Sequence, residues 1–145
     1  MRRRTALALV AACQLAACAA GSPPSGYRID GDGISAPLDG LTGDADRGRA
    51  RLMARDPANC VLCHAVPGAP LAGDVGPSLA GVGRRFTTVE LRLRVVDLRR
   101  VVPQTIMPSY YRTEGLNDVA PEYRGRTLLD AQAIEDIVAY LGTLR

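Results

Sequence analysis

The residues with the clearest chemistry are two cysteines and a histidine in the run Cys60-Val61-Leu62-Cys63-His64. Each thiol can add across one vinyl group of a porphyrin when both thiols lie on one short turn. The imidazole directly after the second cysteine then reaches the iron. This spacing predicts covalent attachment of one c-type haem through Cys60 and Cys63, with His64 as an iron ligand.

A zinc site, a redox pair and a disulfide each fit these residues less well. A structural zinc site needs four Cys or His ligands in spaced pairs, and the remaining cysteines, Cys13 and Cys18, lie in a segment that resembles a removable leader. A thioredoxin-like redox pair is expected near a βαβ pattern, which the sequence does not contain. A disulfide between Cys60 and Cys63 would be strained and would leave the role of His64 open.

The ligand on the opposite side of the iron must be another residue type, because His64 is the only histidine. Methionine is the usual partner of histidine in cytochromes c. Met1 leaves with the leader, and Met53 lies on a predicted helix, where core packing is the commoner role. Met107 lies on a stiff loop between two prolines and is the favoured ligand. The minor alternatives are Tyr110, Tyr111 and a site with bound water.

An imidazole that binds iron normally donates its other N–H to a carbonyl, which fixes the tautomer. The pair Gly76-Pro77 is well placed for this, and Pro77 O is the expected acceptor. The alternative is that residues 76–83 form only a turn.

The segments around the motif predict an all-α domain. A first helix is expected at 45–55, with Asp44 or Thr42 as N-cap and Pro57 beyond its end. Gly48 within it suggests a close helix crossing. Residues 67–83 hold eight Gly or Pro among loop residues and predict irregular backbone.

Two further helices have clear start signals. Thr87-Thr88-Val89-Glu90 has the form of a capping box, and the helix that follows should end at Pro103. Its predicted apolar face consists of Leu91, Val95, Leu98 and Val102. The last helix is expected at 131–144 with Asp130 as its N-cap.

Residues 1–20 have the features of an export signal. Three arginines precede an apolar stretch that is too short to cross a bilayer as a stable helix. The run Leu15-Ala16-Ala17-Cys18 has the form of a bacterial lipobox, which predicts a lipid anchor on Cys18. The alternative is ordinary cleavage among small residues with Cys18 discarded. Either route predicts a periplasmic protein, and no other segment could span a membrane.

The composition beyond the leader indicates one domain, at 44–145, after an extended Gly-, Pro- and Asp-rich arm at 21–43. Removing the three leader arginines reduces the 18 basic residues to 15, which equals the 15 acidic residues. A nucleic-acid role therefore has no electrostatic support. Ile34, Pro37 and Leu38 could attach the arm to the domain or to a partner.

Arginines gather in the middle of the chain, where a solvated helix face is favoured over a docking patch for an acidic partner. They are Arg84, Arg85, Arg92, Arg94, Arg99 and Arg100.

Longer runs of the sequence carry a family resemblance from about Tyr27 to the C-terminus. The most specific is Ile106-Met107-Pro108-Ser109-Tyr110-Tyr111-Arg112. The others are 43–45, 47–50, 59–64, 76–83, 95–97, 115–116, 119–125 and 135–141. Together they resemble the SoxX family, the mono-haem class I cytochromes c of bacterial sulfur oxidation.

The resemblance implies a class I cytochrome c fold of three to five helices around one covalently bound haem c. It implies a heterodimer with a SoxA-type cytochrome subunit, forming the SoxXA (SoxAX) L-cysteine S-thiosulfotransferase. There, thiosulfate is joined oxidatively to a carrier-protein cysteine, and the catalytic cysteine is expected on the SoxA subunit. The haem of the present chain, with His64 and Met107 as axial ligands, would relay the two released electrons to a small cytochrome c.

Two other function classes stay open at this point. One is a stand-alone electron carrier between respiratory complexes. The other is a gas-binding or gas-sensing haem domain, which would require an open or labile sixth site. The lipobox departs from the many relatives that look like plain periplasmic proteins, and this leaves free diffusion in question.

Overall fold

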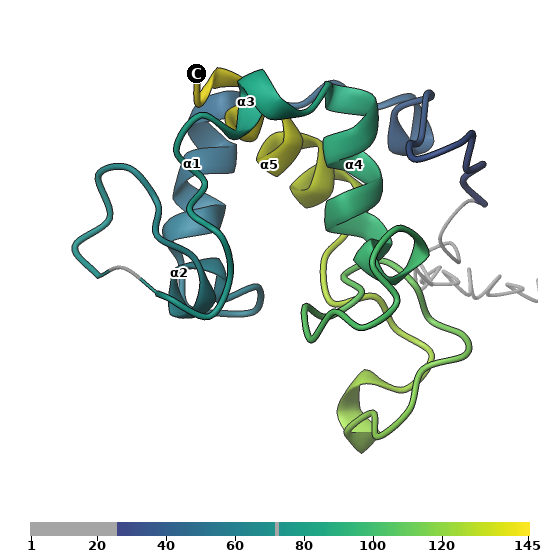
Figure 1. The fold of residues 1–145 in the computed structure, drawn as a ribbon. Helices are drawn as coiled ribbons and strands as arrows, with labels where there is room; N and C mark the ends of the chain where they lie inside the picture. Colours follow the sequence, from purple (N-terminus) through teal and green to yellow (C-terminus); the bar gives the residue numbers. More distant parts are fainter. Residues whose placement is uncertain (1–25, 72) are drawn as a thin grey trace, which may run out of the picture.

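The structure, a computed structural model, describes residues 26–71 and 73–145, so the predicted leader lies outside the described residues. The described part contains five α-helices, and its only β-pairing is an isolated bridge between Asp30 and Gly33 (Figure 1). The α-helices are α1 (Ala45–Met53), α2 (Cys60–Cys63), α3 (Val82–Arg85), α4 (Thr88–Asp97) and α5 (Ala131–Thr143). Short 3-10 helices lie at Leu38–Gly40, Leu98–Arg100 and Pro121–Tyr123. The prediction of an all-α fold is confirmed.

The three long helices begin where their capping residues predicted. Asp44 accepts a hydrogen bond from the N–H of Arg47 at 2.8 Å, and Asp130 accepts one from the N–H of Ala133 at 2.7 Å. Thr87 and Glu90 form the complete capping box of α4. These side chains satisfy N–H groups that have no partner within the helix.

The predicted helix ends were less accurate. α1 ends at Met53, two residues before the expected position, and α3 begins inside the segment predicted to be irregular. α4 ends at Asp97 and not at Pro103, because Asp97 has extended backbone (φ −161°, ψ 83°) and turns the chain into a 3-10 helix.

Helices α1 and α5 cross closely at Gly48. A Cβ atom at this position would overlap the carbonyl oxygen of Asp136 and would lie 2.9 Å from Cβ of Tyr140. The crossing that Gly48 suggested is therefore present, and it brings the backbones of the two helices into direct contact. The position of α5 is thereby fixed relative to α1 (Figure 1).

The carboxylate of Asp136 joins the two helices at this crossing. Its oxygens accept hydrogen bonds from Arg47 Nη2 at 2.8 Å, Arg47 Nε at 2.9 Å and the backbone N–H of Asp44 at 2.9 Å. Burial alone would raise the pKa of Asp136, but the Arg47 guanidinium, the Asp44 N–H and the amide of Gln132 together lower it to about 2. The ionised carboxylate is therefore the stabilising form.

We expect Asp136 to set part of the acid sensitivity of the fold. Because its folded pKa of about 2 lies below the ordinary value of 3.8, its stabilisation is present above about pH 4 and is lost as the pH falls towards 2. Thermal unfolding followed by circular dichroism should give a Tm that decreases over this range. The Asp136→Asn variant should have a lower Tm than the wild type at neutral pH, and its Tm should decrease less on acidification. An equal decrease in Tm in the wild type and the variant would contradict this expectation.

Two segments of the predicted arm, around Ile34 and Leu38, pack on the domain. Ile34 and Leu38 are buried, and the N–H of Ile34 donates to Val89 O at 3.1 Å. The N–H of Leu38 donates to Glu135 Oε1 at 2.9 Å. These contacts attach the arm to α4 and α5.

The prediction of a solvated arginine face is wrong for Arg92. Its side chain is only 6% exposed and forms a two-pronged ion pair with Glu135, with Nε–Oε1 2.7 Å and Nη2–Oε2 2.9 Å. Its Nη1 also donates to Ile34 O at 2.7 Å. Arg92 thus connects α4, α5 and the arm.

In the described part of the chain, no helix has the length and apolarity needed to span a membrane.

Candidate haem site

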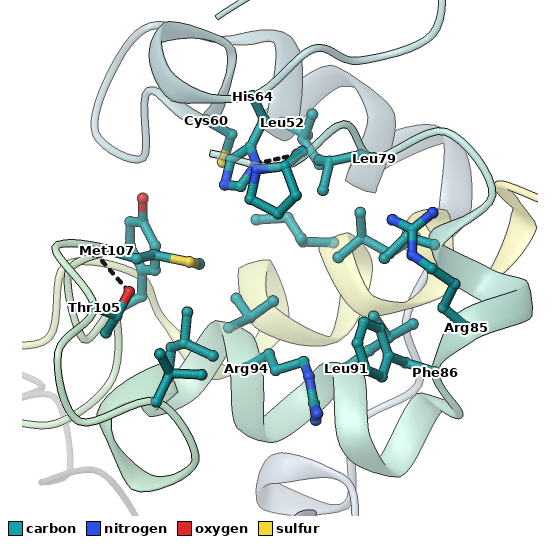
Figure 2. A pocket seen from close by; sticks show the side chains of 18 of the residues that line it. Leu52, Cys60, His64, Leu79, Arg85, Phe86, Leu91, Arg94, Thr105 and Met107 are labelled. Atoms are coloured by element: carbon teal, nitrogen blue, oxygen red, sulfur yellow. Dashed lines mark hydrogen bonds between the residues drawn. The ribbon is translucent and has the colours of Figure 1, made fainter. Parts of the chain in front are cut away.

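A cavity of about 740 Å³ lies between α1, α2, α4 and α5 and the loop that carries Met107 (Figure 2). Its walls are mostly apolar. The apolar lining consists of Leu52, Leu79, Val82, Phe86, Leu91, Val95, Leu98, Val102, Leu129, Ile137 and Leu141. The apolar face predicted for the helix after the capping box, which consists of Leu91, Val95, Leu98 and Val102, therefore lines this cavity. Val102, at the end of this face, is 46% exposed.

The imidazole of His64 enters the cavity from the turn that follows α2 (Figure 2). The turn is closed by a hydrogen bond from the N–H of His64 to Cys60 O at 2.9 Å. On the ring, Nδ1 lies 2.7 Å from Pro77 O, the carbonyl that the sequence indicated as acceptor. If Nδ1 carries the proton, Nε2 is free to bind a metal.

Gly76 leaves the space that this ring occupies. A Cβ atom here would lie 2.5 Å from Cε1 and 2.7 Å from Nδ1 of His64. Real Cβ atoms do not approach this closely, and both the ring and the backbone are held by the bond to Pro77.

We expect Gly76→Ala to disturb the orientation of His64 more than the fold. The added methyl group must push the ring away from Pro77 O, which costs on the order of 1–3 kcal/mol and misdirects Nε2. The absorption spectrum of the purified protein should show weakened or heterogeneous ligation. Gly26→Ala, which adds a Cβ in open space, should not change the spectrum; a wild-type spectrum in Gly76→Ala would contradict the expectation.

The two thiols lie at the ends of the single turn α2. Cys60 lines the cavity and Cys63 does not, although both are free and partly buried. Burial raises the pKa of the Cys60 thiol to about 11. Reactive redox cysteines instead have a lowered pKa, so this environment does not favour the thioredoxin-like alternative.

Met107 reaches the same cavity from the opposite loop, and its thioether points into the open space (Figure 2). Its backbone N–H donates to Thr105 Oγ1 at 3.1 Å. Both described methionines pack partly buried against the core, but the other one, Met53, does not line the cavity. Tyr111 is also absent from the lining. Of the sequence candidates, the structure brings together Cys60, His64, Pro77 and Met107, and Tyr110, a minor alternative ligand, also lines the cavity.

Sequence reasoning considered Tyr110 only as a minor iron ligand and missed its structural contact. Its hydroxyl donates to Ala58 O at 2.8 Å, and burial raises the pKa of this phenol, which keeps the proton in place. The bond connects the methionine loop to the chain just before Cys60. Its position in the specific run 106–112 was the available signal.

Two cavity arginines were also missed as site residues. Arg85 Nη1 donates to Ala80 O at 2.7 Å and Nη2 to Ser78 O at 2.8 Å. The guanidinium of Arg94 stacks on Phe86 at 4.0 Å from the ring centre. These are the cationic groups that could pair with the carboxylates of a porphyrin.

The residues present fit a haem. The cavity combines apolar walls with the thiol of Cys60, the imidazole of His64 and the thioether of Met107. Gly76 leaves the space that the imidazole ring needs. Within the described residues, no group of three or more His, Cys, Asp or Glu side chains is arranged to hold a metal ion.

Comparison with known proteins agrees with this geometry. The family model described as cytochrome c matches residues 45–145. No curated protein sequence matches the chain significantly. The chain is similar to one in the crystal structure of SoxXA from P. pantotrophus, with 30% identity over 81% of this chain and 93% of that chain and a TM-score of 0.73. The chain belongs to the cytochrome c family, as a SoxX-like class I cytochrome that binds haem c covalently.

Proposed function

We propose that this chain is the electron-transfer subunit of a SoxXA-type L-cysteine S-thiosulfotransferase. In this role it pairs with a SoxA-type cytochrome subunit. It accepts the electrons released when thiosulfate is joined oxidatively to a carrier-protein cysteine, and it passes them to a small cytochrome c. The observation that carries the proposal is the likeness to a SoxXA chain over 93% of that chain's length.

The residues of the cavity are assigned roles within this proposal. Cys60 and Cys63 would form the thioether links to the haem, and His64 and Met107 would be its iron ligands. Pro77 O holds the proton of His64 Nδ1, at the observed 2.7 Å. When bound, the haem supplies a one-electron couple.

The apolar walls and the methionine have a common effect in this role. The apolar walls would exclude water from a bound metal, and a thioether ligand would raise the reduction potential relative to nitrogen donors. Both favour transfer of single electrons over binding of external molecules. The described cysteines are both assigned to haem attachment, which is consistent with a catalytic cysteine on the partner.

A periplasmic location is part of the proposal. It is supported by the export features of residues 1–20 and by covalent haem attachment, which suits a compartment outside the cytoplasm. Anchoring through Cys18 is the proposed route of membrane attachment, and mass spectrometry of the mature N-terminus tests it.

The test of the function is co-expression with a SoxA-type cytochrome and purification of the exported product. We expect a heterodimer in which the haem of this chain is reduced when thiosulfate and a carrier protein are added together. It should then be reoxidised by a small cytochrome c. A haem-loaded monomer that does not bind the SoxA-type subunit and reduces a terminal oxidase directly would contradict the proposal and identify a stand-alone electron carrier.

A further inference from the structure

A buried carboxylate lies where α4 ends and outside the haem cavity lining. Asp97 is 0% exposed. Its Oδ1 accepts a hydrogen bond from Ser109 Oγ at 2.5 Å. Its Oδ2 lies 3.3 Å from Nε of Arg112 and 3.4 Å from Nε of Arg100, without a hydrogen bond to either.

Burying a carboxylate is unfavourable unless hydrogen bonds and opposite charges compensate it. Two of the three groups that compensate Asp97 belong to the loop just after Met107. Ser109 follows Met107 by two positions and Arg112 by five. A backbone bond from the N–H of Tyr111 to Val96 O at 3.3 Å fixes the same segment to the end of α4.

The side chain of Met107 is partly buried against the hydrophobic core. Its backbone is held less firmly, because its hydrogen bond to Thr105 is local and Ile106 beside it is 79% exposed. The placement of its thioether therefore depends on the anchored residues that follow. The hydroxyl of Tyr110 anchors the loop to Ala58 on the other side of the cavity.

We infer that Asp97 is a positioning residue for Met107. Its contacts with Ser109 and Arg112 hold the loop so that the thioether stays in the cavity. The inference rests on the proposed assignment of Met107 as an iron ligand, but not on the proposed SoxA partner. A loop held this way opens rarely, and a competing ligand can reach the metal only in the open state. Weakening the contacts of Asp97 with Ser109 and Arg112 should increase the fraction of molecules with an open loop. The apparent affinity for an added ligand should then rise by the same factor as this open fraction.

The experiment titrates the ferric, haem-loaded protein with imidazole at neutral pH and follows the loss of the far-red thioether-to-iron absorption band. We compare the wild type with Ser109→Ala, which removes one hydroxyl, and with Asp97→Asn, which removes the buried charge. Both should bind imidazole at least tenfold more tightly than the wild type. Ser109→Ala decides the question if Asp97→Asn does not yield a haem protein.

The matched control is Asp136→Asn, because Asp136 is an equally buried carboxylate that joins α1 to α5 and does not contact the methionine loop. This variant should lose thermal stability but keep the imidazole affinity within twofold of the wild type. An equal gain in affinity there would show a general loss of stability and overturn the inference. Imidazole affinities within twofold of the wild type in both Ser109→Ala and Asp97→Asn would also overturn the inference. A wild type without the far-red band would instead reject Met107 as a ligand, and the inference with it.

Discussion

Replacing Gly48 with alanine should strongly destabilise the folded protein. The new methyl group would overlap the Asp136 carbonyl and lie 2.5 Å from its carbon atom, so α1 and α5 must separate. Alanine gains about 1 kcal/mol of helix propensity. The overpacking penalty in contact with rigid backbone is larger, on the order of 3 kcal/mol or more. For a domain with a stability of about 5–15 kcal/mol, this is a large loss.

Chemical denaturation of purified wild type and Gly48→Ala measures this loss, and the yield of haem protein is a second readout. Gly142→Ala is the matched control on α5, because its Cβ would meet only Thr88 Cγ2 at an ordinary 3.7 Å. The control should be as stable as the wild type or more stable. A Gly48→Ala protein with wild-type stability would show that the helices do not cross as described.

Replacing Met107, the proposed iron ligand, with alanine should abolish the far-red band of the ferric protein. Nothing else in the cavity lining offers a thioether, since Met53 packs elsewhere. The reduction potential should fall, on the order of 0.1 V or more, because a thioether raises it relative to the nitrogen or oxygen donor that would replace it. Absorption spectroscopy and a redox titration measure the two effects.

Met53→Leu is the control for this substitution. It keeps an apolar side chain of similar volume in the core and should retain both the band and the potential. Persistence of the band in Met107→Ala would mean that the ligand has been assigned to the wrong residue.

Local signals were sufficient to predict where the main helices begin. Asp44, Asp130 and the pair Thr87 and Glu90 each act within one turn of the chain. Gly48 predicted a close crossing, because a glycine inside a helix is unfavourable unless something needs the space. Such signals depend only on residues a few positions apart.

What the sequence could not indicate depends on tertiary contacts. Arg92 is exposed or buried according to whether Glu135, 43 positions away, lies opposite it. Similarly, the carboxylate of Asp97 at the end of α4 is buried with Ser109, 12 positions away, as its hydrogen-bond donor. An apolar stripe on a helix has the same pattern whether it faces a core or a cofactor cavity, so the role of Val95 as a cavity wall was not predictable.

The candidate site was easier to predict than the fold around it. Covalent attachment requires two thiols and a histidine at fixed spacing, so chemistry alone selected Cys60, Cys63 and His64. Because the chain has a single histidine, few residues were left as candidates for the second iron ligand. The bond from Tyr110 to Ala58 required coordinates, because it joins residues 52 positions apart. The contacts of the two cavity arginines are local, but their place in the cavity lining depends on how the surrounding elements pack.

The most direct test of the haem site is mass spectrometry of a tryptic digest of the purified, exported protein. Because the chain has no lysine, trypsin cuts only at arginines, and the peptide 56–84 contains the whole attachment motif. After denaturation, this peptide should carry the mass of one haem, with both thiols consumed. A haem-free peptide with two reactive thiols would contradict covalent attachment at Cys60 and Cys63.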